Sequence, residues 1–130
     1  MKNFFAFAFA AIVLSGASFA QSNAATAGQA PDAANASGTY AVTTNGTQKK
    51  ITAELDSNMP SGLTLSATMA APSGASSAGK KALSSSAVDL VTNVTKVRGS
   101  GLSLNYEAVA TVEADVANTT RTVTYTITNN

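Results

Sequence analysis

Apolar and hydroxyl residues alternate most regularly between Arg121 and Thr128, which read RTVTYTIT. Because successive side chains of a β-strand point to opposite faces, this alternation predicts a half-buried strand. Its apolar face carries Val123, Tyr125 and Ile127. The other face is a row of hydroxyls, here named the threonine row: Thr122, Thr124, Thr126 and Thr128.

Two further runs, Thr39–Thr44 and Thr47–Asp56, flank the dipeptide Asn45-Gly46. Asn and Gly both accept positive φ, so this dipeptide favours a type I′ turn that joins the runs into a β-hairpin. A two-residue loop would place Val42 opposite Lys49 and Tyr40 opposite Ile51. The apolar residues of both runs then share one face, so the turn and the pattern predict the same register.

The same alternation predicts strands at Leu63–Ala71, Lys80–Ser85 and Leu102–Glu113, of which the last is the longest in the chain. Between the first and second of these strands, Pro72–Gly79 consists of small residues and is expected to form an irregular loop.

The segment Ser86–Val97 breaks this period, because its apolar residues recur at spacings of three and four. Ser86 followed by Asp89 can also cap the start of a helix. We therefore expect one short helical turn that crosses between sheets, then a bend at Gly99-Ser100-Gly101. Asp115–Thr120 is expected to turn the chain into the final strand.

Together these elements predict an all-β fold, an antiparallel β-sandwich of six to seven strands with one short helical turn. Its architecture resembles the immunoglobulin-like sandwich. The apolar face of the final strand is expected to close a sheet beside Leu104, Tyr106 and Ala108.

The first residues have the features of a cleaved signal peptide. Lys2 supplies the positive charge, Phe4–Leu14 is an apolar run, and small residues precede a cleavage site after Ala20. This run is shorter than the roughly 20 residues needed to span a bilayer, so no integral membrane segment is expected in the mature chain. The predicted organisation is a signal peptide at 1–20, a flexible N-terminal arm at 21–37 and a β-sandwich domain at 38–130.

The arm, Gln21–Ser37, contains alanine but no large apolar residue. Such a segment buries too little area to offset the entropy lost on ordering. Pilin subunits that polymerise by donating an N-terminal strand need alternating bulky apolar residues in it, and this arm offers only alanine.

Removing the signal peptide also removes all five Phe and Lys2, which leaves three Tyr and seven basic against seven acidic residues. Without a basic excess, neither nucleic acid nor an anionic membrane is an expected partner. The chain has no Cys and no His, so it lacks thiol nucleophiles, the usual general base and the commonest metal ligand. We expect a protein that is not an enzyme and that carries no metal or cofactor.

Two spacings resemble catalytic pairs. Ser77 and Lys80 form the Ser-x-x-Lys pattern of penicillin-binding enzymes, but they lie in a Ser/Gly-rich loop without the companion motifs. Glu54 and Asp56 have a spacing at which paired carboxylates can hydrolyse glycosides. Their position beside Lys50 makes a solvated strand face the simpler interpretation.

Oxygen ligands near Asp56 and Asn58, or Glu113 and Asp115, could contribute to a calcium site, but neither set has the spacing of a dedicated loop. Turn formation is the favoured interpretation. Asn-x-Ser/Thr sequons begin at Asn35, Asn45, Asn93 and Asn118. The abundance of Ser and Thr accounts for much of this number by chance.

The tyrosines Tyr40, Tyr106 and Tyr125 all fall on inward parity. Sugar and single-stranded nucleic-acid binding usually need exposed aromatic platforms, so the pattern argues against both.

The threonine row and a second row at Thr64, Ser66 and Thr68 resemble the T-x-T rows of ice-binding proteins. The structural alternative is that Thr has high β-propensity and fills solvent-facing strand positions.

The sequence thus favours an exported, non-catalytic β-sandwich in the periplasm, at the cell surface or in the secreted fraction. We expect a structural or protein-interaction role in a fibre, matrix or envelope assembly, through other proteins or self-association. The alternative is a soluble extracytoplasmic binding module, in its sharpest form one that binds ice through the threonine row. Strand donation by the arm is a subordinate version of the first hypothesis.

Overall fold

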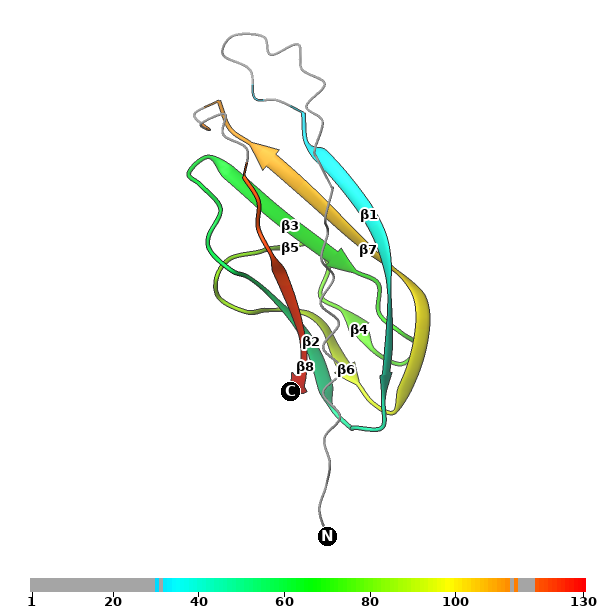
Figure 1. The fold of residues 1–130 in the computed structure, drawn as a ribbon. Helices are drawn as coiled ribbons and strands as arrows, with labels where there is room; N and C mark the ends of the chain where they lie inside the picture. The colour runs from blue at the N-terminus through cyan, green and yellow to red at the C-terminus, as the bar shows by residue number, and fades with distance from the viewer. Residues whose placement is uncertain (1–29, 31, 113, 115–118) are drawn as a thin grey trace.

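The computed structural model describes residues 30, 32–112, 114 and 119–130, which form two antiparallel four-stranded sheets packed as a sandwich (Figure 1). Sheet A contains, in spatial order, β1 (Ala34–Thr44), β7 (Val97–Ala110), β3 (Leu63–Met69) and β5 (Lys81–Ala82). Sheet B contains β4 (Ser76–Ser77), β6 (Val88–Val94), β2 (Lys49–Leu55) and β8 (Val123–Asn129). The predicted all-β sandwich is confirmed.

Consecutive strands always lie in opposite sheets, so every described connection between strands crosses the sandwich. Hydrogen bonds join these connections to each other at both ends of the sheets. At one end, Lys96 N–H donates to the Gly46 carbonyl at 2.8 Å, which joins the β6–β7 and β1–β2 connections. At the other end, the Arg121 guanidinium donates two bonds to the Asn58 carbonyl, at 3.1 and 2.9 Å.

The hydrophobic core lies between the two sheets and receives alternate side chains from both. Its largest fully buried side chains are Leu90, Leu104, Val91 and Val94. The apolar parity of the final strand is confirmed at Val123 and Tyr125, each 7% exposed, while Ile127 is half-buried. The core therefore thins toward the end of β8 at Ile127.

The predicted hairpin at Asn45-Gly46 is wrong. β1 pairs with β7 in sheet A, whereas β2 pairs with β6 and β8 in sheet B. Tyr40 and Ile51 share a parity because they face the common interior from opposite sheets. The local turn preference yields to long-range pairing, since β7 gives β1 a partner along its whole length.

The predicted helical turn at Ser86–Val97 is also wrong, because β6 and the start of β7 occupy this segment. The described residues contain no helix, and therefore no helix that could cross a membrane. The register between β2 and β6 shifts twice, and each shift inserts an extra residue in β6. These bulges turn Leu90, Val91 and Val94 all into the core. Their helix-like spacing is a consequence of the bulges.

The predicted bend at Gly99-Ser100-Gly101 is a bulge within β7. Gly99 faces Val42 and Leu102 faces Tyr40, so β7 has one more residue than β1 between these pairs. Gly101 has a φ of 65°, which glycine adopts without the steric cost of a Cβ. The strand then continues to Ala110, and it is the longest of the fold, as predicted.

Three smaller predictions need correction. The final strand closes sheet B against β2, so Tyr125 meets Tyr106 across the interior instead of beside it. The loop Pro72–Gly79 contains β4, which pairs with β6. Val112 lies beyond the end of β7 and is 59% exposed. Most of the predicted turn at Asp115–Thr120, and all of the predicted signal peptide, lie outside the described residues.

Candidate functional site

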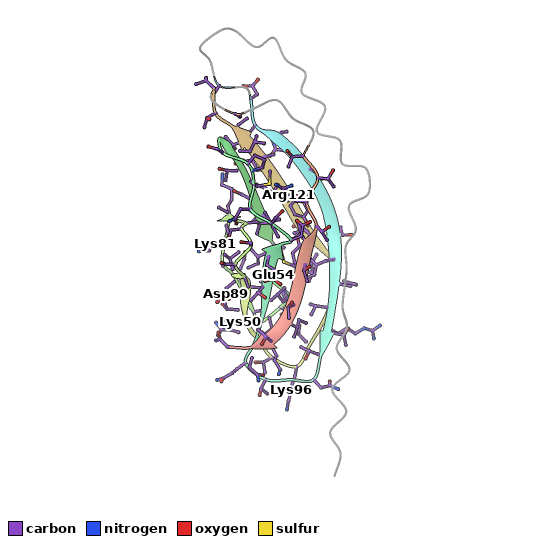
Figure 2. The ribbon with its side chains drawn as sticks, turned by 60° about the vertical axis from the view of Figure 1, so that its left-hand side comes forward. Lys50, Glu54, Lys81, Asp89, Lys96 and Arg121 are labelled. Atoms are coloured by element: carbon purple, nitrogen blue, oxygen red, sulfur yellow. The ribbon has the colours of Figure 1, made fainter. Side chains whose placement is uncertain are left out.

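The threonine row follows β8 on the outer face of sheet B. Its neighbours across the β2–β8 register are Lys50 opposite Thr128, Thr52 opposite Thr126 and Glu54 opposite Thr124. Lys50 forms an ion pair with Asp89 of β6 at 3.1 Å on this face, where Figure 2 also places Glu54. The second row, Thr64 to Thr68, belongs to β3 of sheet A. The structure therefore brings charged residues, not a second threonine row, beside the first.

Ser77 and Lys80 do not meet as nucleophile and base. The Ser77 hydroxyl donates to the Met69 carbonyl at 2.6 Å and accepts from Gly79 N–H at 3.2 Å. Lys80 forms an ion pair with Glu107 at 2.9 Å. The serine thus fastens the turn after β4 to the end of β3, and the lysine lies over the outer face of sheet A.

Asp56 and Asn58 act as turn and loop residues. One oxygen of Asp56 accepts from Ser57 N–H at 2.9 Å and from Thr122 N–H at 3.2 Å. The Asn58 side-chain oxygen accepts from Ser85 N–H at 2.8 Å. Within the described residues, no group of three or more acidic, Cys or His side chains could hold a metal ion. Glu113 and Asp115 lie outside those residues.

Three of the sequons begin at exposed residues, namely Asn35 on β1, Asn45 in the β1–β2 connection and Asn93 on β6. Asn93 also has a φ of 58°, a left-handed conformation that Asn tolerates better than most residues. Asn118, where the fourth sequon begins, is outside the described residues.

The inward parity of the tyrosines is confirmed. Tyr106 and Tyr125 are 4% and 7% exposed, and their hydroxyls form a hydrogen bond across the interior. The half-buried Tyr40 donates its hydroxyl to the Ala70 carbonyl. Burial raises the pKa of Tyr106 and that of Tyr125 above the ordinary value, because the interior disfavours a phenolate. Both hydroxyls therefore stay protonated, and their hydrogen bond links the two sheets.

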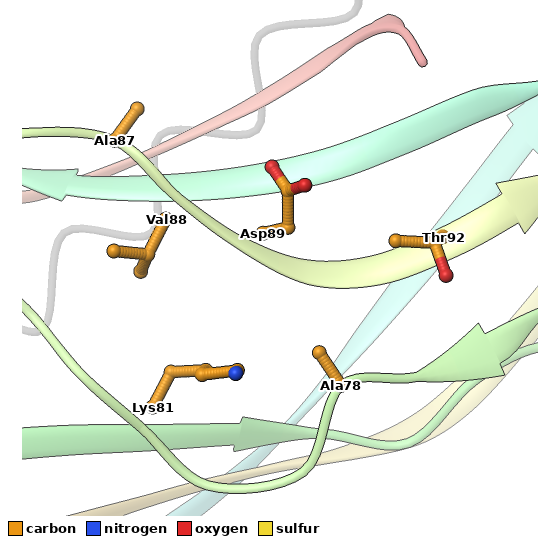
Figure 3. Close-up of a pocket in the computed structure, with 6 residues that line it drawn as sticks. All are labelled: Ala78, Lys81, Ala87, Val88, Asp89 and Thr92. Carbon is orange, nitrogen blue, oxygen red and sulfur yellow. The ribbon is translucent and has the colours of Figure 1, made fainter.

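A wide pocket of about 550 Å³ lies near the β4 and β5 edge of the sandwich (Figure 3). Figure 3 shows Lys81 on the β5 side of the pocket, whereas the Asp89 carboxylate on β6 points away from Lys81, toward β2. Asp89 is already paired with Lys50, and the pocket is open to solvent. This pocket offers a surface of mixed charge without converging polar groups, so it is a weak ligand site.

The opposite side of the sandwich carries a more enclosed groove of about 350 Å³ between β1 and β8, here named the edge groove. Its walls are Thr39–Thr43 of β1 and Tyr125–Ile127 of β8, and Ile51 and Met69 reach it from the core. The lining is mainly apolar and contains no Lys, Arg, Asp or Glu. In this part of the molecule the hydrophobic core meets the surface.

The edge groove was missed from sequence because the predicted hairpin would have paired β1 with β2. In the structure these strands lie in different sheets, which leaves β1 and β8 at the edges on one side of the sandwich. One signal was present in the sequence. Ala34, Ala36 and Gly38, which precede the groove-lining residues of β1, follow each other on its inward parity, so small residues stand beside the groove where large ones would fill a core.

A scan against protein-family models, a search of the curated proteins and a search of the solved structures each found no match to this chain. Its candidate function rests on the edge groove and the surrounding strand edges themselves.

Proposed function

We propose that this protein is an exported, non-catalytic β-sandwich that takes part in a fibre, matrix or envelope assembly through protein contacts. The edge groove is the observation that carries the proposal, since it exposes apolar core between two strands that, among the described residues, each pair on one side only. Concave sites with a mainly apolar lining are the usual form of binding sites in proteins. The signal-like segment before Gln21 supports export to the periplasm, the cell surface or the medium.

An immunoglobulin-like relationship is part of this proposal in its broad sense only. Two packed antiparallel sheets support it. The immunoglobulin order places some consecutive strands in one sheet, whereas here consecutive strands alternate between sheets throughout.

The experiment is surface cross-linking of cells that produce the full chain, using an amine-reactive reagent that reaches the exposed Lys80 and Lys81. The expected result is a chain shortened by about the first twenty residues, found outside the cytoplasm in cross-linked species larger than one copy. A control that lacks Met1–Ala20 should stay in the cytoplasm. Processed chain that is recovered only as a free monomer would contradict an assembly role.

The alternative, a soluble binding module that recognises ice through the threonine row, has less support. Lys50 and Glu54 flank the row on β2, which interrupts the uniform spacing of methyl and hydroxyl groups. The test is ice-growth microscopy and thermal hysteresis for the native chain and for Thr124→Tyr with Thr126→Tyr. Hysteresis that disappears in this double variant would establish ice binding, and native protein without an effect on ice would exclude it.

A further inference from the structure

We propose that the edge groove binds an extended, uncharged segment of a different protein, which adds as a β-strand between β1 and β8 and directs alternate bulky aliphatic side chains into the groove. The inference rests on the proposed interaction role and deepens it by specifying the chemistry of the partner.

The first support is the hydrogen-bonding capacity of the two edges. β1 pairs only with β7 and β8 pairs only with β2 in the described part of the chain. A strand that pairs on one side presents unpaired N–H and C=O groups on the other. An extended peptide can bind such an edge through main-chain hydrogen bonds, while pockets for alternate side chains provide specificity.

The second support is the absence of protection at these edges. Proteins usually guard edge strands with charges, with proline, with β-bulges in the edge strand or by keeping the strand very short. The bulge in the β1–β7 pair has its extra residue in β7 and not in the edge strand β1. β1 has eleven residues and β8 has seven, and neither contains a charged residue or a proline. The edge strands on the other side of the sandwich are protected in this way, because β4 and β5 have two residues each and Lys81 lies on β5. The unguarded side is the one that carries the groove.

The third support is space beneath β1. Gly38 pairs with Leu104, whose side chain is buried, so a side chain at position 38 would also point inward. A Cβ built on Gly38 meets no heavy atom within 4 Å. Gly38 precedes Thr39, the first groove residue on β1, so large side chains from an added strand have room just beyond this end of the groove. They would also cover Tyr40 and Ile127, which the sandwich leaves half-buried.

The source of the segment follows from the composition of this chain. Residues 21–33, which precede β1, contain no bulky aliphatic or aromatic residue. The alternating runs with bulky apolar residues at Leu63–Met69 and Val123–Asn129 are already strands of the sandwich. The connection between β7 and β8 carries the exposed Val112, but it also contains Glu113 and Asp115, so it is not an uncharged segment. Among residues 21–130, a second copy therefore offers no uncharged segment of the required pattern outside its described strands, and the occupant is assigned to another protein.

The test uses the exported chain and three labelled synthetic peptides of the same length as β1. The first alternates Val or Ile with Thr or Ser, the second has the same composition with its aliphatic residues in one block, and the third copies residues 21–31. Fluorescence anisotropy should give a Kd for the alternating peptide at least about tenfold below that of the other two. Amide NMR shifts should move in β1 and β8 and stay unchanged in β4 and β5.

Two matched pairs of variants locate the binding. Gly38→Leu should occupy the open space beneath β1, next to the groove residue Thr39, and weaken binding about tenfold or more. Ser37→Leu, on the outward parity, should leave binding unchanged. Ile127→Lys should weaken binding while Thr128→Lys should not, and this pair decides the matter if Gly38→Leu fails to fold.

Equal binding of the alternating and block peptides, or no binding by either, would overturn the proposal. Preferential binding of the peptide copied from residues 21–31 would also overturn it and would identify a second copy as the occupant. None of these results bears on whether cross-linked assemblies form outside the cytoplasm, so failure here is distinguishable from failure of the proposed function.

Discussion

The two sides of the sandwich differ in how the edge strands of the two sheets are connected. One side of the sandwich is formed by the edge strands β4 and β5 and is here named the closed side. There, the segment from Ala70 to Ser84 crosses repeatedly between the sheets and forms hydrogen bonds to both. Ala78 N–H donates to the Leu90 carbonyl of sheet B, and Leu83 N–H donates to the Leu65 carbonyl of sheet A, both at 2.8 Å. The opposite side, here named the open side, is formed by the edge strands β1 and β8. No strand pairing joins these two strands in the described residues.

This difference shows where the stability and the binding capacity of the molecule are placed. Of the four largest fully buried side chains, Leu90, Val91 and Val94 belong to β6, next to the closed side, and Leu104 belongs to β7, next to β1. The half-buried Tyr40 and Ile127 belong to the edge strands of the open side. Elements that bind partners are commonly the less tightly packed parts of a domain. The variants below measure this contrast from the largest expected effect to the smallest.

Tyr125→Asp is expected to unfold the domain. The carboxylate would replace a buried ring whose hydroxyl bonds to Tyr106, and a buried unpaired charge costs several kcal/mol. Circular dichroism should show loss of the cooperative thermal transition. The control Thr128→Asp, at an exposed position of the same strand opposite Lys50, should change the free energy of unfolding by less than about 0.5 kcal/mol. A soluble Tyr125→Asp that melts cooperatively would mean that Tyr125 does not belong to the core.

Truncation at matched aliphatic positions compares the two sides directly. Leu90→Ala should lower the free energy of unfolding by about 2–5 kcal/mol, because Leu90 is fully buried. Ile127→Ala should cost roughly 1 kcal/mol, since its side chain keeps part of its contact with water. Urea denaturation provides both values. Equal losses would show that the open side is packed as tightly as the closed side.

The hydroxyl pair of Tyr106 and Tyr125 ties the sheets together near the groove. Either single Phe substitution should cost about 1–3 kcal/mol, because it leaves the other buried hydroxyl without its partner. The double Phe variant should lose less than the sum of the two, since no unpaired hydroxyl remains. A double-mutant cycle by urea denaturation measures this coupling, and strictly additive losses would contradict the hydrogen bond.

The same pair gives a pH dependence with a defined sign. Burial raises the pKa of Tyr106 and of Tyr125 above the ordinary value of 10.0, so the folded state holds these protons more tightly than the unfolded state does. Their contribution to stability is therefore complete below about pH 10 and falls as the pH rises above it. Thermal melting between pH 8 and 11 should show a decline that the double Phe variant reduces. An identical decline in both proteins would assign it to other groups, such as Tyr40, whose pKa burial also raises.

The pattern of the sequence predicts the fold where a strand is regular and fails where pairing partners decide. The alternation correctly separated buried from exposed residues at Val123–Tyr125 of β8 and over most of β3. The exceptions are Ser66, which is 8% exposed, and the pair Thr126 and Ile127, which are both half-buried. The pattern could not show that bulges rotate both Leu90 and Val91 inward, because a bulge arises from the register with the neighbouring strand. It also could not show the edge groove. Which strands form the margin of a sheet depends on contacts between residues far apart in the chain.

Alanine substitution of two glycines provides the smallest effects and the most local comparison. Gly74, on the closed side, has a φ of 82°, so Ala should cost about 1–2 kcal/mol even though its Cβ would meet no atom within 4 Å. Gly38, on the open side, has equal space but no left-handed φ. Ala there should stabilise the fold by about 0.4–1 kcal/mol, because it restricts the unfolded chain without straining the folded one. Thermal denaturation of both variants tests this difference. A destabilising Gly38→Ala would mean that the space beneath β1 is already filled, and it would remove the room that a bound strand needs.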